Sequence, residues 1–230
     1  TISGGEPSTF KDLYKVMNIL YNHKRKNIKK VVFTTNGTSL EKISKEDWFT
    51  NVVDFVNISR HHYDQEANDK IFEIKTIDWQ TIKKVSQILG DKGIPINVNC
   101  VLSNKISENY DLDFIVKFVD MARKNYINTL TFRKDYDDGF GIHALETTMK
   151  TAKNITECPV CRKSRYILKG MEVLFTTSEF EPTDVLGENV YEFILQPNGD
   201  LTTDWKGLDK IDILDSINEI RTKNERLITV

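Results

Sequence analysis

The residues best suited to chemistry stand at the very start of the chain, in the run Ser3-Gly4-Gly5-Glu6-Pro7. Ile2 before this run reads as the end of a buried strand, and a helical pattern begins after it. Neither glycine carries a Cβ, so the backbone of such a turn can approach a ligand closely. The free N–H groups of the following helix point back at the same place. The run therefore predicts a ligand-binding turn, with an ordinary glycine-rich turn as the alternative.

Polar residues also follow, or interrupt, each of the later apolar runs that read as strands. In a parallel α/β sheet, ligands bind at the carboxyl ends of the strands, so these residues are expected to gather at one edge. Each alone has a plainer explanation, since Thr-Asn-Gly forms a good turn and Ser59 could cap a helix. In chain order the residues are Thr35, Asn36 and Gly37, then Ser59, Arg60, His61 and His62, then Asn97 and Asn99, and finally Arg133.

Two adjacent histidines, His61 and His62, could act as metal ligands, as a proton shuttle or as substrate contacts. Neighbouring side chains of an extended segment point in different directions, which makes a shared metal ion the least favoured of these roles. We expect one of the two to contact substrate, and a hydrogen-bonded loop histidine is the alternative.

Cys158 and Cys161 form a Cys-x2-Cys turn, which is half of a zinc or iron–sulfur site. A stable tetrahedral site needs four ligands, and no histidine follows His143. Two reduced thiols are therefore the default expectation, with a live auxiliary metal site as the alternative. Cys100 lies inside a strand pattern and is expected in the core. Three cysteines build no disulfide framework, so the sequence favours a reducing, cytoplasmic compartment.

The elements that must position these residues alternate between strand and helix over the first 135 positions, which predicts right-handed βαβ units and a parallel sheet. Strand-like runs cover 31–35, 52–59, 94–102 and 130–132, and helical spacing covers 10–21, 71–89 and 112–122. After residue 135 the pattern changes to loops, a hairpin around 197–200 and a final helix over 211–228. We therefore divide the chain into an α/β core, 1–135, and a small α+β C-terminal extension, 136–230. The strand pattern alone also fits a fragment of an eight-stranded barrel or a doubly wound sheet.

Composition excludes two classes of partner. The 32 Lys and Arg residues nearly balance the 34 Asp and Glu residues, giving a formal net charge of −2. A general nucleic-acid binder would need an excess of basic residues. No apolar run approaches the ~18 residues needed to cross a bilayer, so no membrane partner is expected.

The motifs together resemble the radical S-adenosylmethionine (SAM) superfamily, most closely its molybdopterin-precursor cyclase and SPASM-twitch branch. Gly4-Gly5-Glu6-Pro7 resembles the GGEP motif that holds the amino group of SAM's methionine in that family. Residues 33–37 resemble the TTNG sequence that closes the family's third strand. Residues 56–59, 93–102 and 130–133 match its next three strands by position. The resemblance covers residues 1–135.

The resemblance implies an incomplete (β/α)6-type parallel barrel whose first strand lies outside these residues. It also implies a [4Fe–4S] cluster on a Cys-x3-Cys-x2-Cys loop, a motif that residues 1–230 lack and that is expected before Thr1. Arg133 could pair with the SAM carboxylate. Arg60-His61-His62 departs from the family pattern, and the third cysteine of the branch's auxiliary-cluster segment is missing after Cys161. The SAM contacts that the resemblance implies are Gly4, Gly5, Glu6, Thr35, Asn36, Ser59, Asn99 and Arg133.

The function expected from the resemblance is that of a radical SAM enzyme. With a cluster held upstream of Thr1, it would generate a 5′-deoxyadenosyl radical that abstracts hydrogen from a peptide, a nucleoside or a small metabolite. An electron donor such as flavodoxin or ferredoxin would reduce the cluster. One alternative is a non-catalytic α/β binding module that has lost the cluster. Another is an unrelated barrel enzyme that binds phosphate at Gly4-Gly5.

Overall fold

The structure is a computed structural model that describes residues 1–24, 28–102, 110–134, 153–157, 164–176, 194–196, 198, 200–202 and 210–211. The chain divides into two compact units, Thr1–Phe180 and Glu181–Val230. The boundary expected at residue 135 lies inside the first unit, because strands on both sides of it join one sheet.

The first unit contains a seven-stranded sheet in the order β1-β2-β3-β4-β7-β6-β5. The run from β1 to β7 in this order is parallel, and β6 and β5 continue it as antiparallel strands. Ile2 adds an isolated parallel bridge to Phe33. The expected α/β fold with a parallel sheet is therefore confirmed. The strands are β1 Val32–Thr35, β2 Phe55–Ser59, β3 Ile96–Leu102, β4 Thr129–Lys134, β5 Lys153–Glu157, β6 Ser164–Leu168 and β7 Met171–Thr176.

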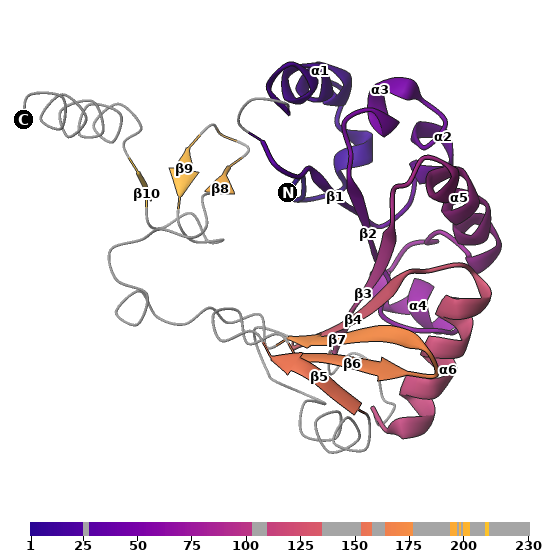
Figure 1. Ribbon diagram of the computed structural model, residues 1–230. Coiled ribbons are helices and arrows are strands. Elements are labelled where there is room, and N and C mark those ends of the chain that lie inside the picture. Colours follow the sequence, from indigo (N-terminus) through magenta and orange to yellow (C-terminus); the bar gives the residue numbers. More distant parts are fainter. Residues whose placement is uncertain are drawn as a thin grey trace, which may run out of the picture. The chain divides into compact units, whose positions relative to one another are not determined.

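The longer helices α1, α5 and α6 lie along the same side of the sheet (Figure 1). Apolar side chains from the strands, such as Phe33, Val56 and Phe132, and from the helices, such as Ile82 and Phe118, form one buried core on that side. The helical elements are η1 Pro7–Thr9, α1 Leu13–Lys24, α2 Leu40–Ile43, α3 Asp47–Thr50, α4 Gln65–Phe72, α5 Trp79–Asp91 and α6 Leu112–Lys124.

The stretch 71–89, expected to be mostly helical, is broken after Phe72, where α4 ends, and α5 begins only at Trp79. Glu73 takes the left-handed conformation with φ of 58°, which ends α4. The Asp69 carboxylate then accepts the Thr76 N–H at 2.7 Å and holds the connecting loop. The helical spacing of apolar residues continues across the break and therefore predicted one helix. The local polar contacts stabilise a loop there instead.

In the second unit, β8 Ile194–Leu195, β9 Leu201–Thr202 and β10 Lys210–Ile211 form an antiparallel sheet in the order β10-β9-β8. The pairing of β8 with β9 confirms the hairpin expected around 197–200. The helix expected over 211–228 lies outside the described residues. Among the helices that the structure describes, none has the length and apolar character to span a membrane.

Candidate functional site

The glycine turn after Ile2 has open space in front of its backbone. Gly4 and Gly5 adopt φ of +94° and +51°, a region that side chains disfavour. A Cβ placed on either glycine would meet no atom within 4 Å. Nothing in the described protein therefore requires glycine here for packing, and the open space can accept a ligand.

The Glu6 carboxylate joins this turn to the turn that follows β1. Its Oε1 accepts hydrogen bonds from the Ser8 N–H at 3.0 Å and the Thr35 hydroxyl at 2.6 Å, and its Oε2 accepts the Asn36 N–H at 2.6 Å. Thr35 Oγ1 accepts in turn from the Gly37 N–H at 2.9 Å. We call these five residues the turn crosslink. It brings together Glu6, Thr35 and Asn36, which the sequence had placed on separate motifs.

The negative charge of Glu6 has no cationic partner among the described residues. A half-buried carboxylate without a counter-ion, next to an open glycine turn, attracts a positively charged ligand group. The Asn36 side chain faces elsewhere, since its Oδ1 accepts from the Thr38 N–H and hydroxyl at 2.9 and 2.6 Å. Asn36 thus contributes to the crosslink through its backbone.

The sheet face opposite the helices, here called the inner face, carries a hydrogen-bonded row of amides and hydroxyls. Asn97 stands at its centre: its Nδ2 donates to Asn57 Oδ1 at 3.1 Å and to Asn99 Oδ1 at 2.7 Å. Its Oδ1 accepts the Thr131 hydroxyl at 3.0 Å, and Asn57 Nδ2 donates to Thr34 Oγ1 at 3.3 Å. We call Thr34, Asn57, Asn97, Asn99 and Thr131 the inner-face network.

Two further predicted residues share this face. Ser59 lies opposite Asn99 in the parallel register, and Asn99 lies opposite Thr131. Arg133 follows one step further along β4, opposite Val101. Ser59, Asn99 and Arg133 therefore lie at the same edge of the sheet, as expected for the carboxyl ends of parallel strands. Sequence reasoning missed Asn57 and Thr131, although the i, i+2 spacing of Asn57 and Ser59 indicated a shared face.

The two histidines point in different directions, as expected for neighbours in an extended segment. His61 is half-buried, its Nδ1 accepts the Val101 N–H at 3.1 Å, and its ring stacks on Phe72 with centroids 4.7 Å apart. His62 is buried, accepts the Asp64 N–H at 2.8 Å, and packs edge-on against Phe114. In the part of the chain that the structure describes, no cluster of three or more His, Cys, Asp or Glu side chains could hold a metal ion.

Arg60 belongs to the core and not to the strand-end group in which the sequence placed it. Its side chain is fully buried beneath the α4–α5 connection, where it donates to the Ile77 carbonyl at 2.9 Å and to Gln65 Oε1 at 3.1 Å. The guanidinium carbon lies 4.5 Å from the centroid of the Trp79 ring. Burial lowers the pKa of Arg60 to about 10, against a partial opposing effect of Asp69.

Of the three cysteines, the structure describes Cys100. Cys100 is buried, as expected, and burial raises the pKa of its thiol. Cys158 and Cys161 lie outside the described residues.

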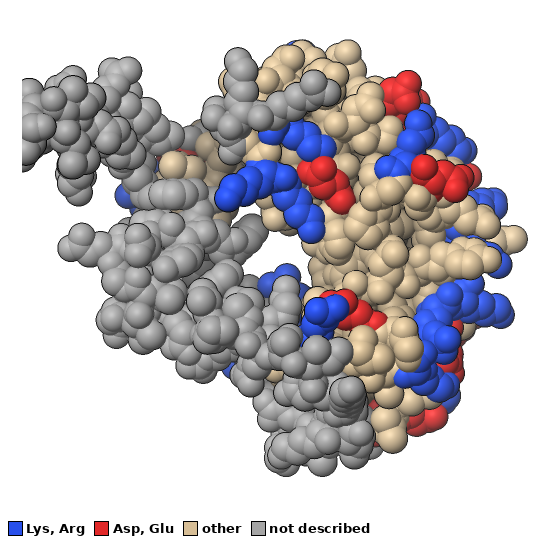
Figure 2. All heavy atoms as spheres, in the orientation of Figure 1, with Lys and Arg blue, Asp and Glu red and all other residues tan. Residues whose placement is uncertain are grey.

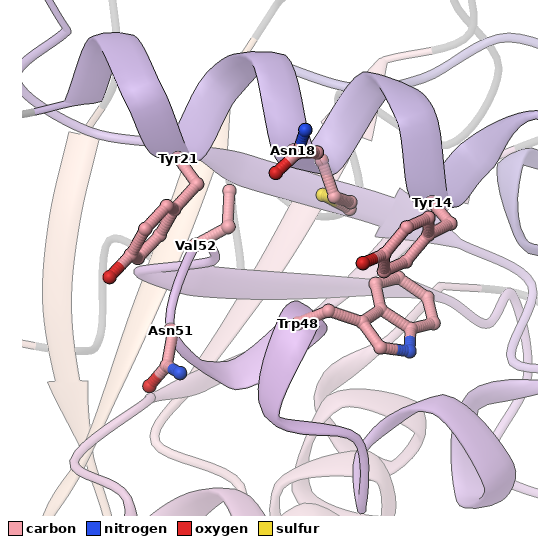
Figure 3. Close-up of a pocket in the computed structure, with 7 residues that line it drawn as sticks. Tyr14, Asn18, Tyr21, Trp48, Asn51 and Val52 are labelled. Carbon is pink, nitrogen blue, oxygen red and sulfur yellow. The ribbon is translucent and has the colours of Figure 1, made fainter.

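A separate cavity of about 180 Å³ lies between α1 and α3, on the helical side of the sheet (Figure 3). The Tyr14 and Trp48 rings meet edge-on at its border, with centroids 5.8 Å apart. Only Leu13 and Met17 of α1 are buried, and Tyr14 and Tyr21 are more than half exposed.

Acidic and basic side chains are interspersed over the described part of the face shown in Figure 2.

Comparison with known proteins identifies a family and several similar proteins. The family model described as the Radical SAM superfamily matches residues 1–119. Two curated relatives, each named a probable GTP 3′,8-cyclase, come from Methanococcus vannielii (29% identical over 182 residues) and Methanococcus aeolicus (26% over 186). Each alignment covers 76% of this chain but only 58% of the relative. The crystal structure of Streptococcus suis SuiB has a similar fold, with a TM-score of 0.55 and 13% identity over 92% of this chain and 53% of that one.

Proposed function

The chain belongs to the Radical SAM superfamily, and from this premise we propose that it binds SAM at the carboxyl ends of its parallel strands as part of a radical SAM enzyme. The family's cofactors are SAM and a [4Fe–4S] cluster. The observation that carries the proposal is the turn crosslink, which fixes a carboxylate beside an open glycine turn, with no cationic partner for it among the described residues.

The groups of SAM match the chemistry along this edge. The carboxylate of Glu6 attracts the SAM ammonium, and the backbone of Gly4 and Gly5 can approach it because no side chain intervenes. Ser59 and Asn99 offer a hydroxyl and an amide to the ribose and carboxylate oxygens. Arg133 supplies a cation for the carboxylate. Thr35 and Asn36 contribute to SAM binding indirectly, because they hold the Glu6 carboxylate in place beside the glycine turn. His61, half-buried at the end of β2, is proposed as a substrate contact.

The residues of this chain fit SAM but do not fit the cluster. Residues 1–230 contain no Cys-x3-Cys-x2-Cys motif. Cys100 is buried in the hydrophobic core, on the opposite side of β3 from Asn99, so it does not face the strand-end site. We propose that the cluster's ligands precede Thr1. A gene sequence with this motif within about 40 residues upstream supports the proposal, and a full-length protein without it contradicts it.

In radical SAM chemistry the cofactors supply hydrogen abstraction from the substrate, and the protein orients SAM and excludes water. We propose flavodoxin or ferredoxin as the electron donor, and a peptide, nucleoside or small metabolite as the substrate. Because the curated relatives are named GTP cyclases, GTP is the first substrate to assay. We propose that Cys158 and Cys161 are reduced thiols; iron lost from reconstituted protein in the double alanine variant would contradict this.

The proposal is tested by calorimetry of SAM binding to Gly5→Ala, with Gly170→Ala as the matched control. Both glycines have positive φ, +51° and +76°, and neither would bring a Cβ near another atom. The two variants therefore carry similar backbone strain, about 1–2 kcal/mol each. We expect Gly5→Ala alone to weaken SAM binding at least tenfold. Equal affinities in the two folded variants would mean that SAM binds elsewhere.

A further inference from the structure

The direction of the hydrogen bonds in the inner-face network depends on Asn97. This side chain is 4% exposed, and all of its polar groups are engaged: the amide nitrogen donates twice and the carbonyl oxygen accepts from Thr131. An amide has two donor hydrogens, so Asn97 Nδ2 has none left for a ligand. Asn97 therefore contacts other side chains and not the ligand.

Asn99 receives its orientation from this contact. Because its Oδ1 accepts from Asn97 at 2.7 Å, its NH2 group must face away from Asn97. The structure gives that NH2 group no partner among the described residues, although Asn99 is only 9% exposed. Thr34 lies at the other end of the network, where its Oγ1 accepts from Asn57 at 3.3 Å. The network therefore leaves the NH2 group of Asn99 as a donor for a ligand.

We propose that Asn97 is a positioning residue that sets the polarity of the inner face, so that Asn99 presents its NH2 group to an oxygen acceptor of the bound ligand. This deepens the proposed function, on which it rests, because the acceptor is a carboxylate or ribose oxygen of SAM. A donor that the bound ligand removes from water without supplying an acceptor is costly, so this NH2 group selects for oxygen acceptors and against donors.

The test reverses the direction of the hydrogen bond between residues 97 and 99 with a side chain of nearly the same shape. Asn97→Asp replaces the donor by an acceptor, so Asn99 must turn its NH2 group inward and present its oxygen to the ligand. Asn57→Asp is the matched control: it adds a carboxylate to the same face, but Asn97 still donates to it and Asn99 keeps its orientation. By calorimetry on the folded, cluster-reconstituted full-length protein, we expect Asn97→Asp to weaken SAM binding at least tenfold and Asn57→Asp by less than threefold.

A double-variant cycle distinguishes positioning from general damage. If Asn97 acts through Asn99, the pair Asn97→Asp and Asn99→Ala together weakens SAM binding no more than Asn99→Ala alone. Should Asn97→Asp fail to fold, Asn97→Ala takes its place in the cycle, since it removes the donor without adding charge. Three results would each overturn this inference but leave the proposed function standing. The first is that the losses of affinity in the two single variants multiply in the double variant. The others are equal losses of affinity in Asn97→Asp and Asn57→Asp, and a folded Asn97→Asp protein with wild-type affinity. A wild-type protein that does not bind SAM would overturn the proposed function together with it.

Discussion

Replacing Glu6 by glutamine tests whether the turn crosslink stabilises the fold. The carboxylate accepts three hydrogen bonds, two of them from the backbone N–H groups of Ser8 and Asn36. A glutamine side chain has one oxygen in place of two, and its NH2 group meets an N–H donor at the other position. Whichever way the amide turns, at least one backbone N–H loses its acceptor.

The magnitude follows from the burial of this contact. An unsatisfied buried donor costs about 1–3 kcal/mol, and Glu6 and Asn36 are only half-buried, so water reduces this to about 1–2 kcal/mol. For a chain of this length, that loss lowers the melting temperature by roughly 2–8 °C. The removal of the negative charge also weakens the attraction for the SAM ammonium, so SAM affinity falls together with stability.

The assay is urea unfolding of Glu6→Gln beside Glu46→Gln, followed by SAM calorimetry on both. Glu46 is an exposed residue at the start of α3 whose side chain makes no capping hydrogen bond, so its substitution changes the same charge without breaking a contact. We expect the Glu46 variant to stay within about 0.5 kcal/mol of wild type. If Glu6→Gln proves as stable as Glu46→Gln, the crosslink does not stabilise the fold and our reasoning about it fails.

Three further outcomes are expected, each measured by urea unfolding. Gly37→Ala should destabilise the fold more than Gly93→Ala. A side chain at positive φ costs about 1–2 kcal/mol at either position. Of these two positions, a Cβ overlaps a neighbour at Gly37 alone, which adds about 1–3 kcal/mol. Burial raises the pKa of Asp54, but hydrogen bonds from Lys24 and a backbone N–H outweigh it and leave the pKa below 3.8. The stability from this lowered pKa is present above about pH 4 and lost as pH falls through the folded value, and Asp54→Asn should flatten that acid limb. Arg60→Met should cost about 1–3 kcal/mol, because it keeps volume but leaves the buried Ile77 carbonyl without its donor. Arg60→Ala should cost about 3–5 kcal/mol, because it adds a cavity to the same loss.

The sequence was a good guide to the parallel sheet and to the gathering of polar residues at its edge. Both follow from chain-local patterns, namely alternation of strand with helix and polar residues where strands end. The proximity of the Gly4-Gly5 turn to Thr35 could be predicted in the same way, because neighbouring parallel strands have their carboxyl ends at the same edge of the sheet.

Direction and register were harder to predict. Arg60 and His61 both follow β2, yet Arg60 enters the core while His61 lies beside Val101 of β3. The alternation of an extended chain separates them, but it assigns sides only once the buried face is known. The break between α4 and α5 depends on the contact of Asp69 with Thr76, which a count of apolar spacing does not detect.

The turn crosslink also bears on the entropy of ligand binding. Flexible loops that close over a cofactor lose backbone freedom on binding, at roughly 1–2 kcal/mol for each residue that becomes fixed. Here the Glu6 carboxylate fixes the two turns to each other within the folded chain, before any ligand arrives. That part of the ordering is completed during folding, and the cofactor meets a preorganised surface.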